Sequence, residues 1–167
     1  MTGVPQGGPL SVVLSNVYLD KLDKELEQRG LRFTRYADDT MIFTKSEMAA
    51  NRVMKSITDW IERKLFLKVN ATKTKVVRPT RSKYIGFTFL KNGSEWKVKP
   101  TTEKKQKLKQ KLSEYLKRSK AVARPLAVTI KRVNEIARGW INYFRIGMMK
   151  QFMAELGAWL RHKIRVI

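Results

Sequence analysis

The hydrophobic pattern of the chain changes at Pro100, and this change limits the folds that the sequence can adopt. After Pro100 the apolar residues recur every three or four positions, which is the spacing of amphipathic helices. Arg124-Pro125 interrupts the pattern, because proline ends a helix. The apolar positions form three groups: Leu108, Leu112, Tyr115 and Leu116; Ile130, Val133, Ala137, Trp140, Ile141 and Phe144; Phe152, Leu156, Trp159, Leu160 and Ile164. Residues 100–167 are therefore predicted to form a three-helix bundle.

Residues 1–99 mix helical and strand patterns. One helix is indicated by a stripe of Leu14, Tyr18, Leu22 and Leu26 that stops at Gly30, and a second begins after Ser46, a plausible N-cap. Strand patterns cover residues 31–36, 40–44, 84–90 and 96–98, with shorter β-prone pieces at 67–70 and 75–77. Asn92-Gly93 is a strong hairpin signal. We predict an α+β chain, with an antiparallel sheet and helices in residues 1–99 and the helical bundle in residues 100–167.

Two adjacent carboxylates, Asp38 and Asp39, lie between the strand patterns at 31–36 and 40–44, where a two-residue turn is expected. Like charges repel, and Asn-Gly or Asp-Gly is the commoner choice in such a turn. One interpretation is a solvated turn. The other is a site for Mg²⁺, which prefers carboxylate oxygens and substrate phosphates as ligands. The remaining aspartates, Asp20, Asp23 and Asp59, fall on the polar sides of predicted helices and are expected to be solvated.

The chain is strongly basic, with 36 Lys and Arg against 14 Asp and Glu and a formal net charge of +22. Residues 1–99 hold 19 basic and 10 acidic residues, whereas residues 100–167 hold 17 and 4. This excess favours binding to a phosphate backbone; a merely solvated basic surface is the alternative. The absence of cysteine and the single histidine, His162, exclude a zinc site. No membrane span or signal peptide is apparent, so a cytoplasmic or organellar protein is expected.

Five motifs appear in the order that is typical of one protein family: Gly3-Val-Pro-Gln-Gly-Gly8, Arg35-Tyr-Ala-Asp-Asp39, Asn70-Ala-Thr-Lys-Thr74, Tyr84-Ile-Gly-Phe87 and Trp140-Ile-Asn-Tyr-Phe144. Together they resemble the group II intron reverse transcriptases, also called maturases. The resemblance covers nearly the whole chain. It implies that residues 1–99 are the C-terminal part of a polymerase palm and that residues 100–167 are the thumb, or maturase X domain.

The resemblance also implies an incomplete metal site. These polymerases hold two Mg²⁺ ions with three carboxylates, and the third comes from a palm strand that would precede Met1. Neither that strand nor the fingers is present in the sequence. Asp38 is expected to be the shared metal ligand, and Asp39 to support the second metal. We therefore expect no primer extension by this chain alone.

Further roles follow from the resemblance. Template and nucleotide contacts are expected from Pro5, Gln6, Gly7, Gly8, Tyr36 and Lys73, and a primer grip from Tyr84, Gly86 and Phe87. A nucleic-acid track is expected from Lys104, Lys105, Lys109, Lys111, Lys117, Arg118, Arg138 and Arg145, with Asn142 beside the last two. The alternatives are an ordinary strand aromatic at Tyr36, a helix-entry turn at residues 5–8, a solvated lysine at position 73, a structural strand glycine at position 86 and a solvated face for the lysine run. Trp140 and Phe144 are assigned to the bundle core.

Two functions are compatible with these features. The first is an RNA-directed DNA polymerase portion that uses Mg²⁺ and dNTPs. The second is a maturase-like protein that binds intron RNA and assists splicing without polymerising. Expected partners are RNA and RNA–DNA duplex, with self-association or complementation by the missing N-terminal half, and no membrane.

Overall fold

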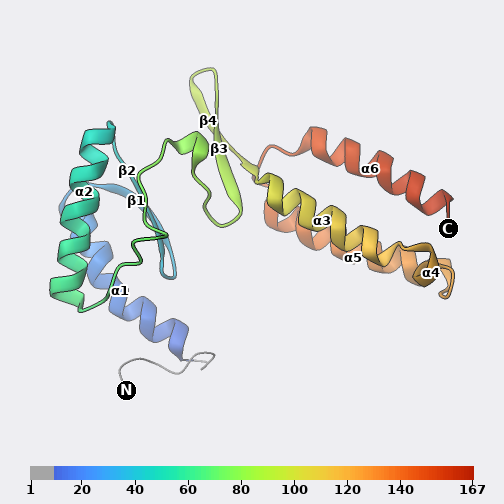
Figure 1. Ribbon diagram of the computed structural model, residues 1–167, viewed down its shortest axis with the longest axis horizontal. Coiled ribbons are helices and arrows are strands. Elements are labelled where there is room, and N and C mark those ends of the chain that lie inside the picture. Colours follow the sequence, from blue (N-terminus) through green and yellow to red (C-terminus); the bar gives the residue numbers. More distant parts are fainter. Residues whose placement is uncertain (1–9) are drawn as a thin grey trace. The chain divides into compact units, whose positions relative to one another are not determined.

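The computed structural model describes residues 10–167 (Figure 1). They divide into two compact units, with the boundary between Val77 and Arg78. Each unit contains helices and one two-stranded antiparallel sheet. This confirms the predicted α+β class. None of the helices within residues 10–167 is long and apolar enough to cross a membrane.

The first unit contains two long helices and one hairpin. Its elements are α1 (Ser11–Gln28), β1 (Arg32–Tyr36), β2 (Asp39–Phe43), α2 (Glu47–Trp60) and the π-helical turn η1 (Ile61–Leu65). The hydroxyl of Ser46 caps α2 by accepting a hydrogen bond from the Ala49 amide at 3.2 Å, as the sequence predicts. Gly30, at φ +65°, lets the chain leave α1 in the left-handed region. The core consists of Leu22, Leu26, Ile57 and Leu65.

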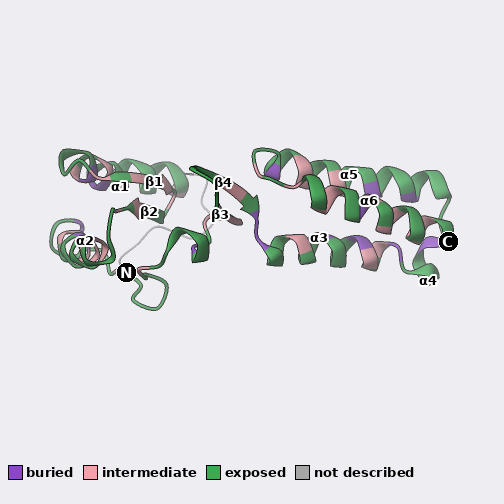
Figure 2. Ribbon diagram, turned by 90° about the horizontal axis from the view of Figure 1, so that it is seen from above, coloured by how far each residue is buried: buried purple, intermediate pink, exposed green. Residues whose placement is uncertain are grey.

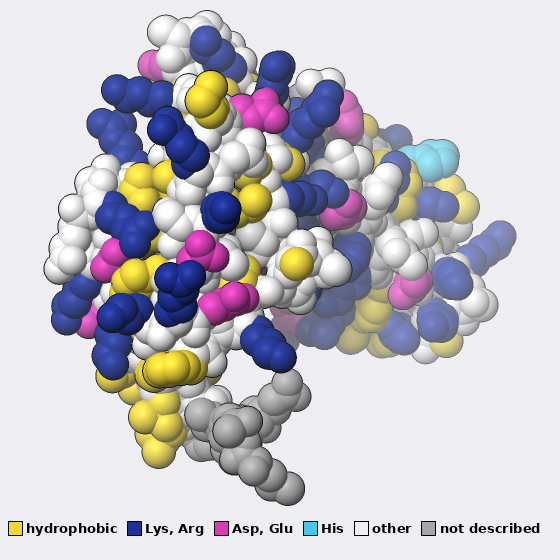
Figure 3. All heavy atoms as spheres, turned by 60° about the vertical axis from the view of Figure 1, so that its left-hand side comes forward, with side chains coloured by type: hydrophobic (Ala, Val, Ile, Leu, Met, Phe, Trp, Pro, Cys, Tyr) yellow, Lys and Arg dark blue, Asp and Glu magenta, His cyan; other side chains and the backbone are white. Residues whose placement is uncertain are grey.

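The apolar stripe of α1 is buried along only half of its length. Leu22 and Leu26 enter the core, whereas Leu14 is half exposed and Tyr18 is 41% exposed. Val13 and Val17, beside them, are exposed as well. Hydrophobic side chains also come to the surface at the lower edge of the face in Figure 3, among the Lys and Arg side chains that spread over it. The N-terminal half of α1 therefore presents an apolar surface that no described residue covers.

The β-prone pieces at 67–70 and 75–77 form no strand in the described part of the chain. A strand needs a hydrogen-bonded neighbour, and β1 and β2 pair only with each other among the described strands. The loop between the two pieces is ordered by Asn70 instead. Its Oδ1 accepts hydrogen bonds from the amides of Thr72 and Lys73 at 3.1 and 3.2 Å.

The second unit begins with the short helix η2 (Pro79–Arg81) and the hairpin β3 (Phe87–Asn92) and β4 (Glu95–Pro100). The helices α3 (Thr102–Tyr115), α4 (Arg118–Ala121), α5 (Leu126–Phe144) and α6 (Lys150–Arg165) follow. The hairpin is confirmed, but its turn is Gly93-Ser94, because Asn92 pairs with Glu95. The hairpin belongs to the same compact unit as the bundle. Its assignment to a palm that ends at residue 99 stays a prediction.

The bundle core confirms the predicted helical stripes. Leu108, Leu112 and Leu116 pack with Val133 of α5 and Leu156 of α6. Figure 2 shows the buried residues as short purple patches on helices whose other residues are intermediate or exposed. The prediction that the first helix of the bundle continues to the interruption at Arg124-Pro125 is wrong, because α3 ends at Tyr115 and a separate short helix follows. Neither glycine nor proline marks this break. It occurs where buried Leu116 and Ala121 anchor both sides of a corner.

Candidate metal hairpin and nucleic-acid interface

The two carboxylates occupy different positions in the β1–β2 hairpin. Asp39 is the first residue of β2 and pairs with Tyr36, so the two turn residues are Ala37 and Asp38. The prediction of an Asp-Asp turn was therefore wrong by one residue. Ala37 has φ +53°, a left-handed conformation that a residue with a Cβ adopts only when its surroundings hold it there. Asp38 thus lies at the tip of the hairpin and Asp39 at the end of a strand.

The strand register places Tyr36 beside the carboxylates. Cross-strand partners share a face of the hairpin, so the side chains of Tyr36 and Asp39 lie on the same side. Tyr36 is 64% exposed, and both aspartates are exposed. Phe33 and Ile42, on the opposite side, pack against the core of the first unit. Tyr36 and the two aspartates are therefore accessible to solvent.

Arg35 holds the turn against α1. Its Nε and Nη2 donate to the two carboxylate oxygens of Asp23 at 2.8 and 2.5 Å. Its Nη1 donates to Asn16 Oδ1 and to the carbonyl of Ala37, both at 2.9 Å. The side chains of Arg35 and Asp23 are only 12% and 23% exposed. This bidentate pair is of the stronger, charge-assisted kind, and it stabilises the left-handed residue of the turn.

Asp23 and Arg35 were missed as site residues. The prediction that Asp23 is a solvated helix charge was wrong, whereas Asp20 does lie at the surface, in an ion pair with Lys24. A signal was available in the strand pattern. Arg35 alternates onto the inward side together with Phe33, and a charged side chain at an inward position needs a partner.

The donor set suits Mg²⁺ but is partial. Asp38 and Asp39 supply hard carboxylate oxygens at an exposed position, which is the chemistry that Mg²⁺ requires. Within residues 10–167 there is no group of three or more acidic, His or Cys residues that would hold a metal ion. The hairpin therefore offers two carboxylates to a metal ion.

The predicted template and nucleotide contacts fall in three places, of which Tyr36 on the β1–β2 hairpin is one. Pro5, Gln6, Gly7 and Gly8 lie outside the described residues. Lys73 is exposed and lies in the turn that Asn70 organises. The Oδ1 atom of Asn70 also accepts a hydrogen bond from the Thr72 hydroxyl at 2.7 Å. The loop thus fixes the backbone of Lys73 and leaves its side chain in solvent.

The predicted primer grip is a tight turn and not a strand. Tyr84 and Phe87 exchange backbone hydrogen bonds of 2.9 and 2.8 Å, and the two residues between them have positive φ. Ile85 is at +49° and Gly86 at +83°. Only Phe87 continues into β3. The strand prediction for residues 84–86 was wrong, because an apolar pattern does not report the two left-handed residues of the turn.

This turn packs against the helices of its own unit. A Cβ on Gly86 would lie 3.0 Å from Lys104 Cε and 3.3 Å from Phe144 Cζ, so glycine permits this approach. Tyr143 donates its hydroxyl to the carbonyl of Ile85 at 3.0 Å. Phe87 lies in an aromatic cluster, with ring centroids 4.9 Å from Phe144 and 6.0 Å from Tyr143. Phe144 is buried, as predicted.

The eight residues of the predicted nucleic-acid track do not share one surface. Lys105 and Lys109 lie above Phe152 and Trp159 of α6, with 5.2 and 5.4 Å between each ammonium and ring centroid. Lys104 packs at Gly86, and Lys111 follows it seven residues later on the same side of α3. Of the remaining four, Lys117 and Arg118 line a pocket formed by residues of α3, α4 and α6. Arg138 lies along α5, and Arg145 lies at the end of that helix.

One electrostatic shift marks the start of α3. Glu103 lies in the first turn, and Lys83 donates a hydrogen bond to its carboxylate. This bond and the charge of Lys83 lower the pKa of Glu103 below its ordinary value. The pair connects the segment before β3 to the bundle.

Comparison with protein families identifies both parts of the chain. Residues 1–89 match the reverse transcriptase (RNA-dependent DNA polymerase) family. Residues 105–167 match the group II intron, maturase-specific domain. No curated protein gives a match to the chain. The order of the two matches agrees with the hairpin and the helical bundle described above, and the chain belongs to the group II intron reverse transcriptase/maturase family.

Proposed function

We propose that these residues form the C-terminal palm and the thumb of an RNA-directed DNA polymerase of the group II intron type. The observation that carries the proposal is the β1–β2 hairpin. It presents Asp38 and Asp39 to solvent, with Tyr36 on the side of Asp39. A basic chain that only bound RNA would have no need of two acidic residues at this position.

The residues of the hairpin have distinct tasks in this proposal. Asp38 and Asp39 would hold Mg²⁺, which, when bound, stabilises charge on the attacking and leaving oxygens of nucleotidyl transfer. Tyr36 would contact the primer end, and Lys73 the triphosphate of the incoming dNTP. Arg35 acts indirectly as a positioning residue, because it fixes the turn that carries Asp38.

A metal titration tests the hairpin without requiring activity. Mn²⁺, a paramagnetic substitute for Mg²⁺, should broaden the NMR signals of residues 37–40 more than those of the rest of the first unit. Asp38→Asn should abolish this selective broadening, whereas Asp20→Asn should preserve it. If the same signals broaden equally in the Asp38→Asn variant, the metal assignment is wrong.

Two carboxylates are insufficient for the two-metal reaction, so the 167 residues alone should not extend a primer on an RNA template with Mg²⁺ and dNTPs. Mg²⁺-dependent extension that disappears in Asp38→Asn would refute this expectation.

The exposed apolar half of α1 is the surface on which we expect the remaining palm to pack, in the same or in a second polypeptide. Self-association through the same surface is the alternative, and sedimentation tests it. If the chain dimerises through α1, Val13→Ser/Val17→Ser should reduce the fraction of dimer.

The maturase-like function is a second candidate, and the charge of the second unit favours it. Residues 78–167 hold 23 basic and 5 acidic residues. Such a unit would bind structured RNA, with affinity falling steeply as salt rises. If Asp38→Asn and Asp39→Asn leave RNA binding and assisted splicing unchanged, the binding function is independent of the metal hairpin.

A further inference from the structure

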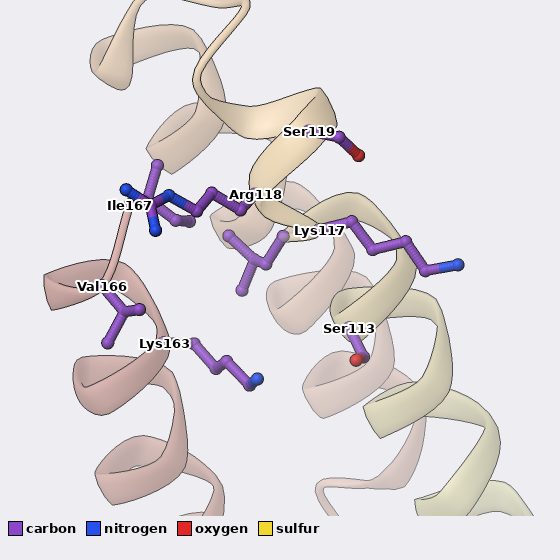
Figure 4. A pocket seen from close by; sticks show the side chains of 8 residues that line it. Ser113, Lys117, Arg118, Ser119, Lys163, Val166 and Ile167 are labelled. Carbon is purple, nitrogen blue, oxygen red and sulfur yellow. The ribbon is translucent and has the colours of Figure 1, made fainter.

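A pocket of about 430 Å³ lies at the end of the bundle where α3 and α4 meet α6. Its polar lining comes from Ser113, Lys117, Arg118, Ser119 and Lys163. In the close view of Figure 4, Arg118 extends from the corner toward Ile167, and Lys163 extends from α6 toward Ser113. Lys117 points away from both and lies at the rim. Two cations therefore approach the pocket from different helices.

The packed core fixes the positions from which these side chains emerge. Leu116, at the end of α3, is 4% exposed, and Ala121 at the end of α4 is 2% exposed. Between them, the backbone of Lys117 has φ −59° and ψ +127°, so the chain turns sharply before Arg118. Lys163 follows Leu156 by seven residues and therefore emerges from the inward side of α6. It is half buried, at a position where the helical pattern would favour an apolar residue.

The polar side chains that line the pocket are cationic or carry a hydroxyl group. No Asp or Glu lines it. Over residues 10–167, no ion pair is formed by Lys117, Arg118 or Lys163. The hydroxyl of Ser113 adds a neutral donor, whereas the side chain of Ser119 points away from Arg118 and Lys163 in Figure 4. A guanidinium fork, an ammonium and a hydroxyl are the kinds of donor that bind the oxygens of a phosphate group.

A row of cations on α3 leads to this pocket. Lys105, Lys109 and Ser113 follow one another at four-residue spacing, about 6 Å per step along a helix. The two lysines lie above Phe152 and Trp159 of α6, and Ser113 lies in the pocket. A backbone that follows the seam between α3 and α6 therefore meets further cations before it reaches Arg118 and Lys163.

We propose that this pocket binds a phosphate group of a nucleic acid, with Arg118 and Lys163 as its principal ligands. This inference rests on the proposed nucleic-acid function and specifies where one phosphate is held. The phosphate is either an internal phosphodiester of a nucleic-acid strand that follows the seam or the terminal monophosphate of such a strand. The pocket would bind the non-bridging phosphate oxygens in both cases.

The test compares the 167-residue chain with Arg118→Gln/Lys163→Gln. Its control is Arg161→Gln/Arg165→Gln, which removes two exposed charges from the other side of α6. We expect the pocket variant to bind RNA about tenfold more weakly, with a salt dependence reduced by about one phosphate contact. The control should lose clearly less affinity. Equal losses in both variants, each folded by circular dichroism, would overturn the proposal.

Inorganic phosphate tests the pocket apart from RNA. Titration should shift the NMR signals of Ser113, Arg118 and Lys163 in the wild-type chain but not in the pocket variant, and no shift would overturn the proposal. Phosphate shifts without RNA binding would support the pocket and refute the nucleic-acid function. RNA with a 5′-phosphate and with a 5′-hydroxyl distinguishes the two sources. Loss of affinity on removing the phosphate identifies a terminal monophosphate, and equal affinity identifies an internal diester.

Discussion

The two units of the molecule differ in charge and in how completely they bury their apolar surface. Residues 1–77 hold 13 basic and 9 acidic residues, a net charge of +4, whereas residues 78–167 have a net charge of +18. The first unit leaves half of the α1 stripe exposed, and the second encloses the leucines of α3 between α5 and α6. The carboxylates that would hold metal thus lie in the nearly neutral unit. Most of the positive charge that would attract nucleic acid belongs to the other unit.

The largest expected effect concerns the bundle core. Leu112 is fully buried, and Leu112→Ala should lower the free energy of unfolding of the second unit by about 2–5 kcal/mol, because it leaves a cavity. Leu26→Ala is the matched change in the first unit. Thermal unfolding followed by NMR should show each variant destabilising its own unit. Equal destabilisation of both units by either variant would mean that they unfold as one.

A smaller effect is expected at the hairpin. Arg35→Gln should cost about 1.5–3 kcal/mol in the first unit, because it removes charge-assisted hydrogen bonds to a mostly buried carboxylate. Amide exchange at Ala37 should become faster. Asp20→Asn removes an exposed pair and should cost about 0–1 kcal/mol. A similar cost for both would contradict the role assigned to Arg35.

The proposed metal ligands and most of the basic residues belong to different units, so removing charge from each unit should affect RNA binding differently. Without Mg²⁺, Asp38→Asn/Asp39→Asn should change RNA affinity by no more than about twofold, because these carboxylates contact no phosphate in the absence of metal. Lys105→Gln/Lys109→Gln should weaken binding several-fold and reduce the salt slope by about 0.7 per lost contact on single-stranded RNA. If Asp38→Asn/Asp39→Asn changes RNA affinity more than Lys105→Gln/Lys109→Gln does, the proposed division of roles between the two units is wrong.

The smallest expected effect is a pH dependence in the stability of the second unit. Because Lys83 lowers the pKa of Glu103, the pair stabilises the folded state fully above the ordinary glutamate pKa, about 4.3. This stabilisation is lost as the pH falls through the lower folded-state pKa. Carboxyl NMR titration should show a Glu103 midpoint below the ordinary value, and Lys83→Met should raise it. An unchanged midpoint in the variant would show that Lys83 is not the cause.

Regular periodicity was sufficient to predict the helices and the bundle core. The stripes containing Leu112, Val133 and Leu156 meet as expected, because residues at helical spacing share a face. Local turns were less predictable. The Tyr84–Phe87 turn and the end of α3 at Tyr115 were both missed. Each depends on a few backbone angles that tertiary contacts stabilise, at Gly86 against Lys104 and at Leu116 in the core.

The sequence by itself determined the α+β class, the order of the motifs, the basic charge and the adjacency of Asp38 and Asp39. These properties depend on composition and on local periodicity. Only the tertiary structure decided that Arg35 joins Asp23 to the turn and that the basic residues divide among separate surfaces. The physical reason is that hydrogen-bond partners and shared faces depend on which elements pack together. Arg35 and Asp23 are 12 residues apart in the chain, and Arg118 and Lys163 come from different helices.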